Sequence, residues 1–328
     1  MTPEFLQTRL RLGLADICLG MAAILSASQS WAAESTIKLV VPFAAGGSID
    51  VMARLLAPRL SKGLQQNVIV ENRTGAGGVI GTEQVIRSEP DGRTLLMAST
   101  YLATNVLVPH PRFDPLVDLL PVVQINSIEI LLMVNDKLEV QSLADLKRLA
   151  QSKPGGLNCA AGAGVMTLGC ERLAVVLEGK SVSVPYSGLA PAVAALMAGH
   201  VDIAFLDRAS ATTAIDGRRV RVLASAGATV ARPPFEQAPL LKNTWPGFSL
   251  VGFGGAFAPA GTPGTTIQRL NQEFNTALND PEVRAAAARS GEHLVGGTPE
   301  VLGKTLSAAI DNYSRFNNDA AARATPSR

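Results

Sequence analysis

The chain has 328 residues, of which 47% are hydrophobic and 17% charged, and its formal net charge is +2. This composition is too apolar and too weakly charged for a disordered protein, and the length is that of about two ordinary domains. A net charge this small, with no cluster of Lys and Arg among aromatic residues, argues against a nucleic-acid partner.

The N-terminal segment differs from the rest of the chain. Arg9 and Arg11 precede a short apolar stretch over 17–27, and Ser30-Trp31-Ala32 places small residues at the two positions that a signal peptidase reads. The pattern predicts a secretory signal peptide, residues 1–32, cleaved after Ala32. The alternative, a membrane anchor, needs about 20 apolar residues. Neither this stretch nor any later one is that long, so we expect an exported protein without a membrane-inserted segment.

Cleavage would leave two cysteines, Cys159 and Cys170. In an oxidising compartment they can form a disulfide, provided that their Cα atoms come within about 7 Å. The alternative is two thiols buried in the core, and the sequence leaves both open.

The first elements repeat one order: strand, glycine-rich loop, helix. A β-branched apolar run over 36–43 predicts a buried strand, and a loop over 44–47 separates it from an amphipathic helix over 48–62. The same order follows in the strand 67–70, the loop 73–78, the helix 79–88 and the strand 94–98. This alternation predicts parallel strands joined by right-handed crossovers.

The middle of the chain resumes this alternation after an irregular segment over 109–115. Strands are expected at 122–125 and 128–134, and Ser142 is a candidate N-cap for a helix over 143–152. Further strands are expected at 157–161, 182–184, 202–206 and 220–226, with helices at 167–178 and 190–198.

The C-terminal part is one strand, 249–258, followed by helices at 266–278 and 282–290 and a last helix with Pro299 in its first turn. The C-terminal helices need a sheet to cover, and the predicted helices of the first sheet end near residue 90. We therefore place the C-terminal helices on the first sheet. The prediction is an α/β protein of two domains. Residues 33–134 and 250–328 form the first, residues 135–249 form the second, and two crossings between them make a hinge.

Three glycine-rich loops each precede a helix. Gly46 and Gly47 lie in the first, Gly77 and Gly78 in the second, and Gly164 in the third. Glycine lets backbone N–H groups approach a ligand, and a helix N-terminus adds unpaired donors and partial positive charge. Such loops at the carboxyl ends of parallel strands predict an anion site. The alternative is that these glycines only make turns.

The sequence motifs for nucleotide binding are incomplete, and motifs for catalysis are absent. The glycines from Gly75 to Gly81 are one residue off the dinucleotide fingerprint, and Ala174 stands where a phosphate loop ending at Gly179-Lys180-Ser181 would need glycine. No G-x-S-x-G elbow occurs, and the three histidines are scattered. We predict no cofactor, no metal site and no catalytic residue.

Three further side chains near the loops have two interpretations each. Asp50 lies in the first turn of a helix, where compensation of the helix dipole is favoured over ligand contact. Asp207 follows an apolar strand and can either accept a hydrogen bond from a ligand hydroxyl or amine or cap the next helix. Phe43 is expected to pack in the core. The alternative is that its ring forms one wall of the pocket over a flat ligand.

Longer motifs resemble a known family. The segments LVVPFAAGGSID over 39–50 and VENRTGAGGVIG over 70–81 closely resemble the two binding loops of the tripartite tricarboxylate transporter receptors, also called Bug receptors. Segments 90–96, 184–188, 258–263 and 280–284 are similar to further motifs of that family, in the same order. The resemblance covers nearly the whole mature chain.

The resemblance implies a periplasmic binding protein-like fold, in which two Rossmann-like domains close on a ligand cleft as a Venus flytrap. It implies a periplasmic receptor that captures a small carboxylate and delivers it to a separate membrane permease of two subunits. We expect the receptor to be a monomer. The predicted ligand-binding residues are Phe43, Ala45, Gly46, Gly47, Ser48, Asp50, Ala76, Gly77, Gly78, Gly164, Thr167 and Asp207.

The chain departs from the family at two places. Val165 and Leu168 stand where the family often has Ser and His, and Phe253-Gly254 replaces a frequent Trp-aromatic pair. These departures predict a more apolar far end of the pocket, and a monocarboxylate with an apolar or aromatic body as ligand. A ligand-sensing co-receptor for a sensor kinase could use the same pocket. A secreted hydrolase or isomerase is the third alternative, and it would need a poised base.

Overall fold

The computed structural model describes residues 36–106, 110–162, 164–186, 188–217, 219–227 and 231–324, without the side chains of 316–324. The predicted signal peptide lies outside the described residues. In the described part of the chain, no helix is both long and apolar enough to cross a membrane.

The first sheet has six strands in the order β11-β4-β10-β3-β1-β2. As predicted, β1 (Ile37–Val41) pairs in parallel with both β2 (Val68–Asn72) and β3 (Thr94–Ser99). The return strand β10 (Gly252–Pro259) enters antiparallel to β3, and β4 (Leu119–Ile128) and β11 (His293–Leu294) complete the sheet antiparallel to their neighbours.

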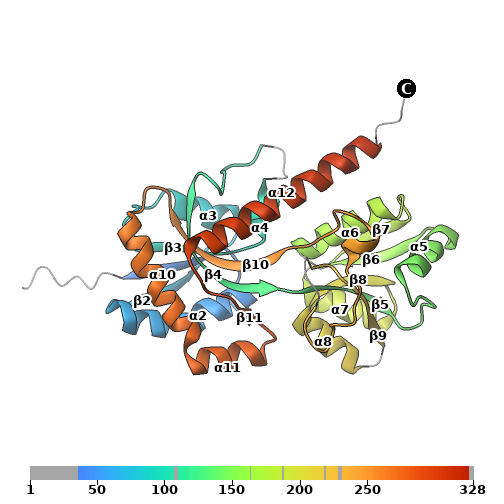
Figure 1. Cartoon of the computed structure of the whole chain (residues 1–328), viewed down its shortest axis with the longest axis horizontal. Helices are drawn as coiled ribbons and strands as arrows, with labels where there is room; N and C mark the ends of the chain where they lie inside the picture. Colours follow the sequence, from blue (N-terminus) through green and yellow to red (C-terminus); the bar gives the residue numbers. More distant parts are fainter. Residues whose placement is uncertain are drawn as a thin grey trace, which may run out of the picture. The chain divides into compact units, whose positions relative to one another are not determined.

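The helices of this sheet come from both ends of the chain, as Figure 1 shows. The N-terminal ones are α2 (Ser48–Leu64), the short 3-10 helix η2 (Ala76–Gly78), α3 (Val79–Ile86) and α4 (Tyr101–Asn105). The C-terminal ones are α10 (Gly264–Asn279), α11 (Pro281–Arg289) and α12 (Pro299–Ala324). Helix α10 packs against α2 and β4, and α12 against β4 and α4, which confirms the predicted return of these helices to the first sheet.

Local sequence explains these helices. The buried positions of α10, among them Ile267, Leu270 and Phe274, recur at spacings of three and four and so form one apolar stripe. Asp280 ends α10 and accepts hydrogen bonds from the backbone N–H groups of Glu282 and Val283, so it is the N-cap of α11.

The second sheet has five strands in the order β7-β6-β8-β5-β9. Strands β6 (Leu157–Ala161), β7 (Ser181–Pro185) and β8 (Ile203–Asp207) are parallel, whereas β5 (Ile130–Asn135) runs antiparallel to β8 and to β9 (Val220–Ser225). Its helices are α5 (Leu143–Ser152), α6 (Val165–Val176), α7 (Leu189–Ala198), α8 (Arg208–Asp216) and α9 (Leu241–Thr244).

The chain changes sheets at a single residue. β4 ends at Ile128 in the first sheet and β5 begins at Ile130 in the second, so Glu129 is the connection. The strand predicted over 128–134 is therefore a strand of the second sheet. Strands β4 and β5 are both apolar, and no turn residue lies between Ile128 and Ile130. The sequence pattern therefore could not indicate that the two strands belong to different sheets. The division into domains near 134 and 250 stays a prediction.

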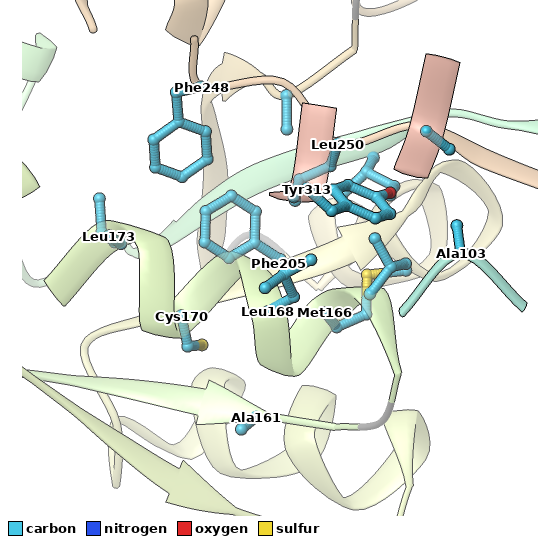
Figure 2. Close-up of a cluster of buried hydrophobic side chains, with 14 of the residues drawn as sticks. Ala103, Ala161, Met166, Leu168, Cys170, Leu173, Phe205, Phe248, Leu250 and Tyr313 are labelled. Carbon is cyan, nitrogen blue, oxygen red and sulfur yellow. The ribbon is translucent and has the colours of Figure 1, made fainter. Parts of the chain in front are cut away.

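The core of the second sheet contains the two cysteines. Cys159 on β6 and Cys170 on α6 form a disulfide, with 5.7 Å between their Cα atoms, so the interpretation as two free thiols does not hold. Both are fully buried. On the other side of α6, Phe205 and Phe248 stack with ring centroids 5.9 Å apart (Figure 2).

Candidate functional site

The first two glycine-rich loops lie at the same edge of the first sheet. The first loop, Ala44–Gly47, follows β1, and the second loop, Thr74–Gly78, follows β2. Because β1 and β2 are adjacent and parallel, their carboxyl ends meet at one edge. Residues 44–48 are exposed, and so are Ala76 and Gly77. The sequence prediction that these two loops come together is confirmed.

The first loop turns at Gly46, whose φ of +88° belongs to the left-handed region that favours glycine. Apart from Gly46 and its two chain neighbours, no described residue has an atom within 4 Å of the place where a Cβ on Gly46 would stand. Gly47 is the N-cap of α2, and among the described residues no side chain caps this helix. The start of α2 therefore offers backbone N–H groups toward open space.

Asp50 holds the first loop. Its carboxylate accepts hydrogen bonds from the Gly46 N–H (2.8 Å), from Nε of Arg54 (3.0 Å) and from Nδ2 of Asn72 (2.9 Å). The residue is 2% exposed. The Arg54 hydrogen bond, with those of Gly46 and Asn72, outweighs the cost of burial and lowers the pKa of Asp50 to about 2. The carboxylate is therefore ionised and is engaged by three groups of this chain.

The second loop consists of backbone in an unusual conformation. Gly75, Ala76, Gly77 and Gly78 all have positive φ, with +64° at Gly77 and +47° at Ala76, which is uncommon for a residue with a Cβ. Apart from its chain neighbours, a Cβ on Gly77 would have no described residue within 4 Å, as at Gly46. The two loops thus present bare backbone to the same side of the sheet.

An aromatic pair supports the second loop from behind. A Cβ on Gly78 would lie 2.9 Å from Cε2 of Tyr101 and 3.3 Å from Cζ of Phe43, so only glycine fits. The rings of Phe43 and Tyr101 meet edge to face at 5.1 Å. The Tyr101 hydroxyl hydrogen-bonds Thr82 Oγ1 (2.7 Å), which in turn donates to the Gly78 carbonyl (2.9 Å). Of the two interpretations of Phe43, this packing supports the core role.

The third loop precedes α6 in the second sheet. Gly164, with φ +50°, is the N-cap of α6, and no described side chain caps this helix. Apart from its chain neighbours, no described residue lies within 4 Å of the place where a Cβ on Gly164 would stand. Thr167 is partly buried. Val165 and Leu168 are 8% and 7% exposed, since this face of α6 packs into the core. The expectation that these two side chains make the far end of the pocket apolar is therefore not supported by their burial.

Asp207 ends β8 and is the N-cap of α8. Its Oδ1 accepts a hydrogen bond from the Ser210 N–H at 2.7 Å, so the capping interpretation is realised. Asp207 also lies close enough to Glu292 to contribute to its electrostatics. The pKa of Glu292 is raised, chiefly by burial and further by the charge of Asp207, while a hydrogen bond from Asn126 opposes the rise.

Sequence reasoning did not predict the hydrogen bond that Nδ2 of Asn126 donates to Oε2 of Glu292. Asn126 is a buried polar residue in the mostly apolar strand β4, and Glu292 follows the helix-ending Gly291. A polar residue within an apolar strand is a signal that could have drawn attention to Asn126. The described residues contain no group of three or more His, Cys, Asp or Glu side chains able to hold a metal ion.

Two sheets flanked by helices, with glycine-rich loops that lead from parallel strands into helices without a side-chain cap, define a periplasmic binding protein-like fold. The chain belongs to the tripartite tricarboxylate transporter family of receptors, whose family model matches residues 52–302. This is a family of solute-binding receptors and not of enzymes.

Relatives in sequence span nearly the whole chain. A protein encoded in the tcbD-tcbE intergenic region of Pseudomonas sp. strain P51 is 32% identical over 96% of this chain and 95% of its own length. BugT of Bordetella pertussis is 34% identical over 80% of this chain and 82% of its own.

Solved structures agree with this assignment. Rpa4515 from R. palustris, solved with adipate, superposes with a TM-score of 0.74 at 27% identity, covering 89% of this chain and 98% of its own. MatC from Rhodopseudomonas palustris, solved with malate, gives 0.72 at 29% identity, covering 86% and 98%. The periplasmic binding protein BugD gives 0.71 at 25% identity, covering 87% and 97%.

Proposed function

We propose that this protein is a periplasmic receptor that captures a small carboxylate and delivers it to a separate membrane permease of two subunits. The observation that carries the proposal is the bare backbone of the two loops, at Gly46–Gly47 and Ala76–Gly78, beside the start of α2. Rpa4515 and MatC, which share the fold, were solved with adipate and malate.

The electrostatics of the first loop support an anion there. A buried carboxylate at Asp50 would repel a ligand carboxylate if its charge were uncompensated. Arg54, Asn72 and the Gly46 N–H compensate that charge, and the N-terminus of α2 adds partial positive charge. We assign Asp50 the role of holding the loop in shape for the ligand, without contact to the ligand itself.

The binding roles follow from the same geometry. The ligand carboxylate binds to backbone groups of the two loops, namely those of Gly46, Gly47, Ser48, Ala76, Gly77 and Gly78, with Ala45 beside them. Phe43 supports the second loop. Gly164, Thr167 and Asp207 complete the site from the second sheet. Binding shifts the population toward a closed form only if the ligand binds that form better, and the permease then distinguishes closed from open receptors.

The test is thermal unfolding of the purified protein with citrate, succinate, glutamate, nicotinate, benzoate and terephthalate. A ligand at about 100 times its dissociation constant stabilises by about 2.7 kcal/mol. A shift confined to carboxylates, absent with matched amides and sugars, supports the proposal. A folded protein that shifts with no carboxylate contradicts it. Co-purification of the permease subunits with the loaded receptor tests the partner separately.

A further inference from the structure

Helix α6 of the second sheet carries a fully buried arginine. Arg172 is 0% exposed, and burial lowers the pKa of its guanidinium to about 10, so the group is still charged at pH 7. A buried charge is costly unless hydrogen bonds satisfy it. The groups that accept hydrogen bonds from Arg172 therefore decide how this side chain, and the helix that carries it, can be placed.

The groups around Arg172 come from two other segments of the chain. Its Nη1 donates to the carbonyl of Ser249 at 2.8 Å and to Oδ1 of Asn312 at 2.9 Å, and its Nη2 donates to the carbonyl of Asn312 at 2.9 Å. The guanidinium carbon lies 5.0 Å from the ring centroid of Tyr313, within the range of a cation–π contact. Asn312 and Tyr313 lie on α12, so one side chain of α6 contacts two consecutive residues of the C-terminal helix.

The same contacts hold the return segment, residues 249–251, which leads from α9 of the second sheet to β10 of the first. The N–H of Leu250 donates to the carbonyl of Ala226, directly after β9, at 2.7 Å. The hydroxyl of Tyr313 donates to the carbonyl of Val251 at 2.7 Å and accepts from the N–H of Val251 at 3.1 Å. With the hydrogen bond from α6 to its first residue, each residue of the return segment is bound to a different element.

Helix α12 belongs to the first sheet, where it packs against β4 and α4. Helix α4 follows β3, which is parallel to β1, so α4 starts at the edge that carries the first two loops. On α4, Tyr101 supports the second loop. Ala103 of α4 belongs to the same buried cluster as Leu168 of α6 and Tyr313 of α12 (Figure 2). Packing is therefore continuous from the second loop through α4 to α6.

Helix α6 begins at the third loop, with Gly164 as its N-cap. Val165, Leu168 and Arg172 follow at spacings of three and four and so lie on one face of the helix. All three side chains are buried. Because this face includes the side chain that is bound to α12, the contacts of Arg172 also fix where the third loop lies relative to the first sheet.

We propose that Arg172, Asn312 and Tyr313, which we call the clasp, hold α6 and the third loop in place against the first sheet before a ligand binds. Arg172 is then a positioning residue for the ligand site. The inference rests on the proposed function, which assigns the third loop to that site. Moving α6 away from α12 would take the buried guanidinium from both acceptor atoms of Asn312, which opposes the motion. A loop that is already held loses little conformational freedom on binding, so the clasp raises the affinity for a ligand that contacts both sheets.

Two variants release the clasp from opposite sides. Arg172→Met fills a similar volume and donates no hydrogen bond, whereas Asn312→Ala removes the Oδ1 acceptor on α12. Asn312 is only partly buried, so its variant serves if Arg172→Met does not fold. Asn312→Asp keeps an acceptor at this place and should behave as the wild type does. Ser142→Ala is the matched control, because it removes the N-cap of α5 and lowers stability without touching the clasp.

The first measurement needs no ligand. Spin labels on Gln272→Cys in α10 and Ala194→Cys in α7, both at exposed positions, report the distance between the two sheets by pulsed electron spin resonance. We expect the distance distribution to be at least about twofold wider in the two clasp variants than in the wild type. The Asn312→Asp and Ser142→Ala proteins should give the wild-type distribution. A wild-type distribution in folded Arg172→Met, or in Asn312→Ala should the first variant not fold, overturns the inference.

The second measurement is calorimetric titration of the same proteins with succinate and with citrate at pH 7. We expect the clasp variants to bind at least about threefold more weakly than the wild type, because α6 must then be ordered on binding. The Ser142→Ala protein should bind as the wild type does, and an equal loss of affinity in this control would reduce the effect to one of stability. Wild-type affinity in a variant with the wide distribution would remove the positioning role from Arg172. If the wild type binds neither compound, that result counts against the proposed function, and the distance distributions still decide whether the clasp holds the two sheets.

Discussion

The side chain of Asn72, the last residue of β2, donates to Oδ1 of Asp50 at 2.9 Å and to the carbonyl of Phe43 at 3.0 Å. One amide therefore joins the end of the second strand to the first loop and to the helix that follows it. Arg54 closes the ring by donating to Asn72 Oδ1 at 2.9 Å. The end of β2, which leads into the second loop, is therefore fixed to the first loop through Asp50 without a ligand, and this lowers the conformational entropy that binding must overcome.

The first prediction concerns Asp50→Asn. The folded-state pKa of about 2 lies below the ordinary 3.8, so the folded protein binds fewer protons than the unfolded chain between these values. The stability from Asp50 is complete above pH 4 and is lost as the pH falls toward 2. The shift corresponds to at most about 2 kcal/mol, since Arg54 is half exposed. Urea unfolding should show the variant less stable than wild type at pH 7, and the gap should shrink by pH 2.5. A gap independent of pH would contradict the role of the charge.

The second prediction uses two glycines in the same backbone conformation. Gly46 and Gly155 have φ of +88° and +81°, and at each, apart from the two chain neighbours, a Cβ would have no other described residue within 4 Å. Alanine at either position should therefore cost a similar ~1 kcal/mol of unfolding free energy from backbone strain. Only Gly46→Ala places a methyl group at the proposed anion site, so it alone should weaken carboxylate binding, by tenfold or more. Equal affinities of the two variants would remove Gly46 from the site.

The third prediction concerns the support of the second loop. Tyr101→Phe removes the hydroxyl that hydrogen-bonds Thr82 and keeps the ring that packs against Phe43. Loss of one buried hydrogen bond should lower the unfolding free energy by about 1 kcal/mol. Because Thr82 also holds the Gly78 carbonyl, ligand affinity should fall a few-fold. Thermal unfolding and calorimetric titration of the same preparation separate the two effects, and an unchanged affinity would show that Tyr101 serves stability alone.

The fourth prediction concerns the disulfide between Cys159 and Cys170, which are separated by 11 residues in sequence. A loop of that length restricts the unfolded chain by about 3 kcal/mol. Reduction should lower the denaturant midpoint accordingly. The double variant Cys159→Ala and Cys170→Ala should already have the lower midpoint and should not respond to reductant. A wild-type midpoint that does not change on complete reduction would contradict this.

The fifth prediction follows from the half-buried carboxyl of Glu292. Its pKa is raised in the folded protein, so the folded state binds more protons than the unfolded chain above the ordinary pKa of 4.5. Stability is therefore lost as the pH rises through the interval between the ordinary and the raised values. Glu292→Gln should be more stable than wild type at pH 8 and similar at pH 4, measured by thermal unfolding without ligand. A variant that is less stable at pH 8 would show that the ionised form is favoured by its surroundings.

Local sequence patterns predicted much of the fold. The alternation of apolar strands and amphipathic helices predicted the parallel strands β1, β2 and β3, and the excess of helices at the C-terminus predicted their return to the first sheet. The loops at Gly46 and Gly77 could be found because their conformation needs glycine, and because parallel neighbours bring their ends to one edge. These features depend on neighbours in the chain, which the sequence displays directly.

Other features depend on contacts between distant residues, and only the tertiary structure decided them. The sequence could not assign β5 to the second sheet, orient Val165 and Leu168 into the core, or choose between a disulfide and two thiols. Nor could it bring Glu292 to Asn126, 166 residues away. The burial and the electrostatics of these residues depend on which helix and sheet surfaces pack together. Two sequences with the same hydrophobic periodicity can pack those surfaces differently. The sequence by itself therefore determined the family, the kinds of element and the two glycine-rich loops that we propose as the anion site, while packing determined the disulfide, the sheet to which β5 belongs and the partner of Glu292.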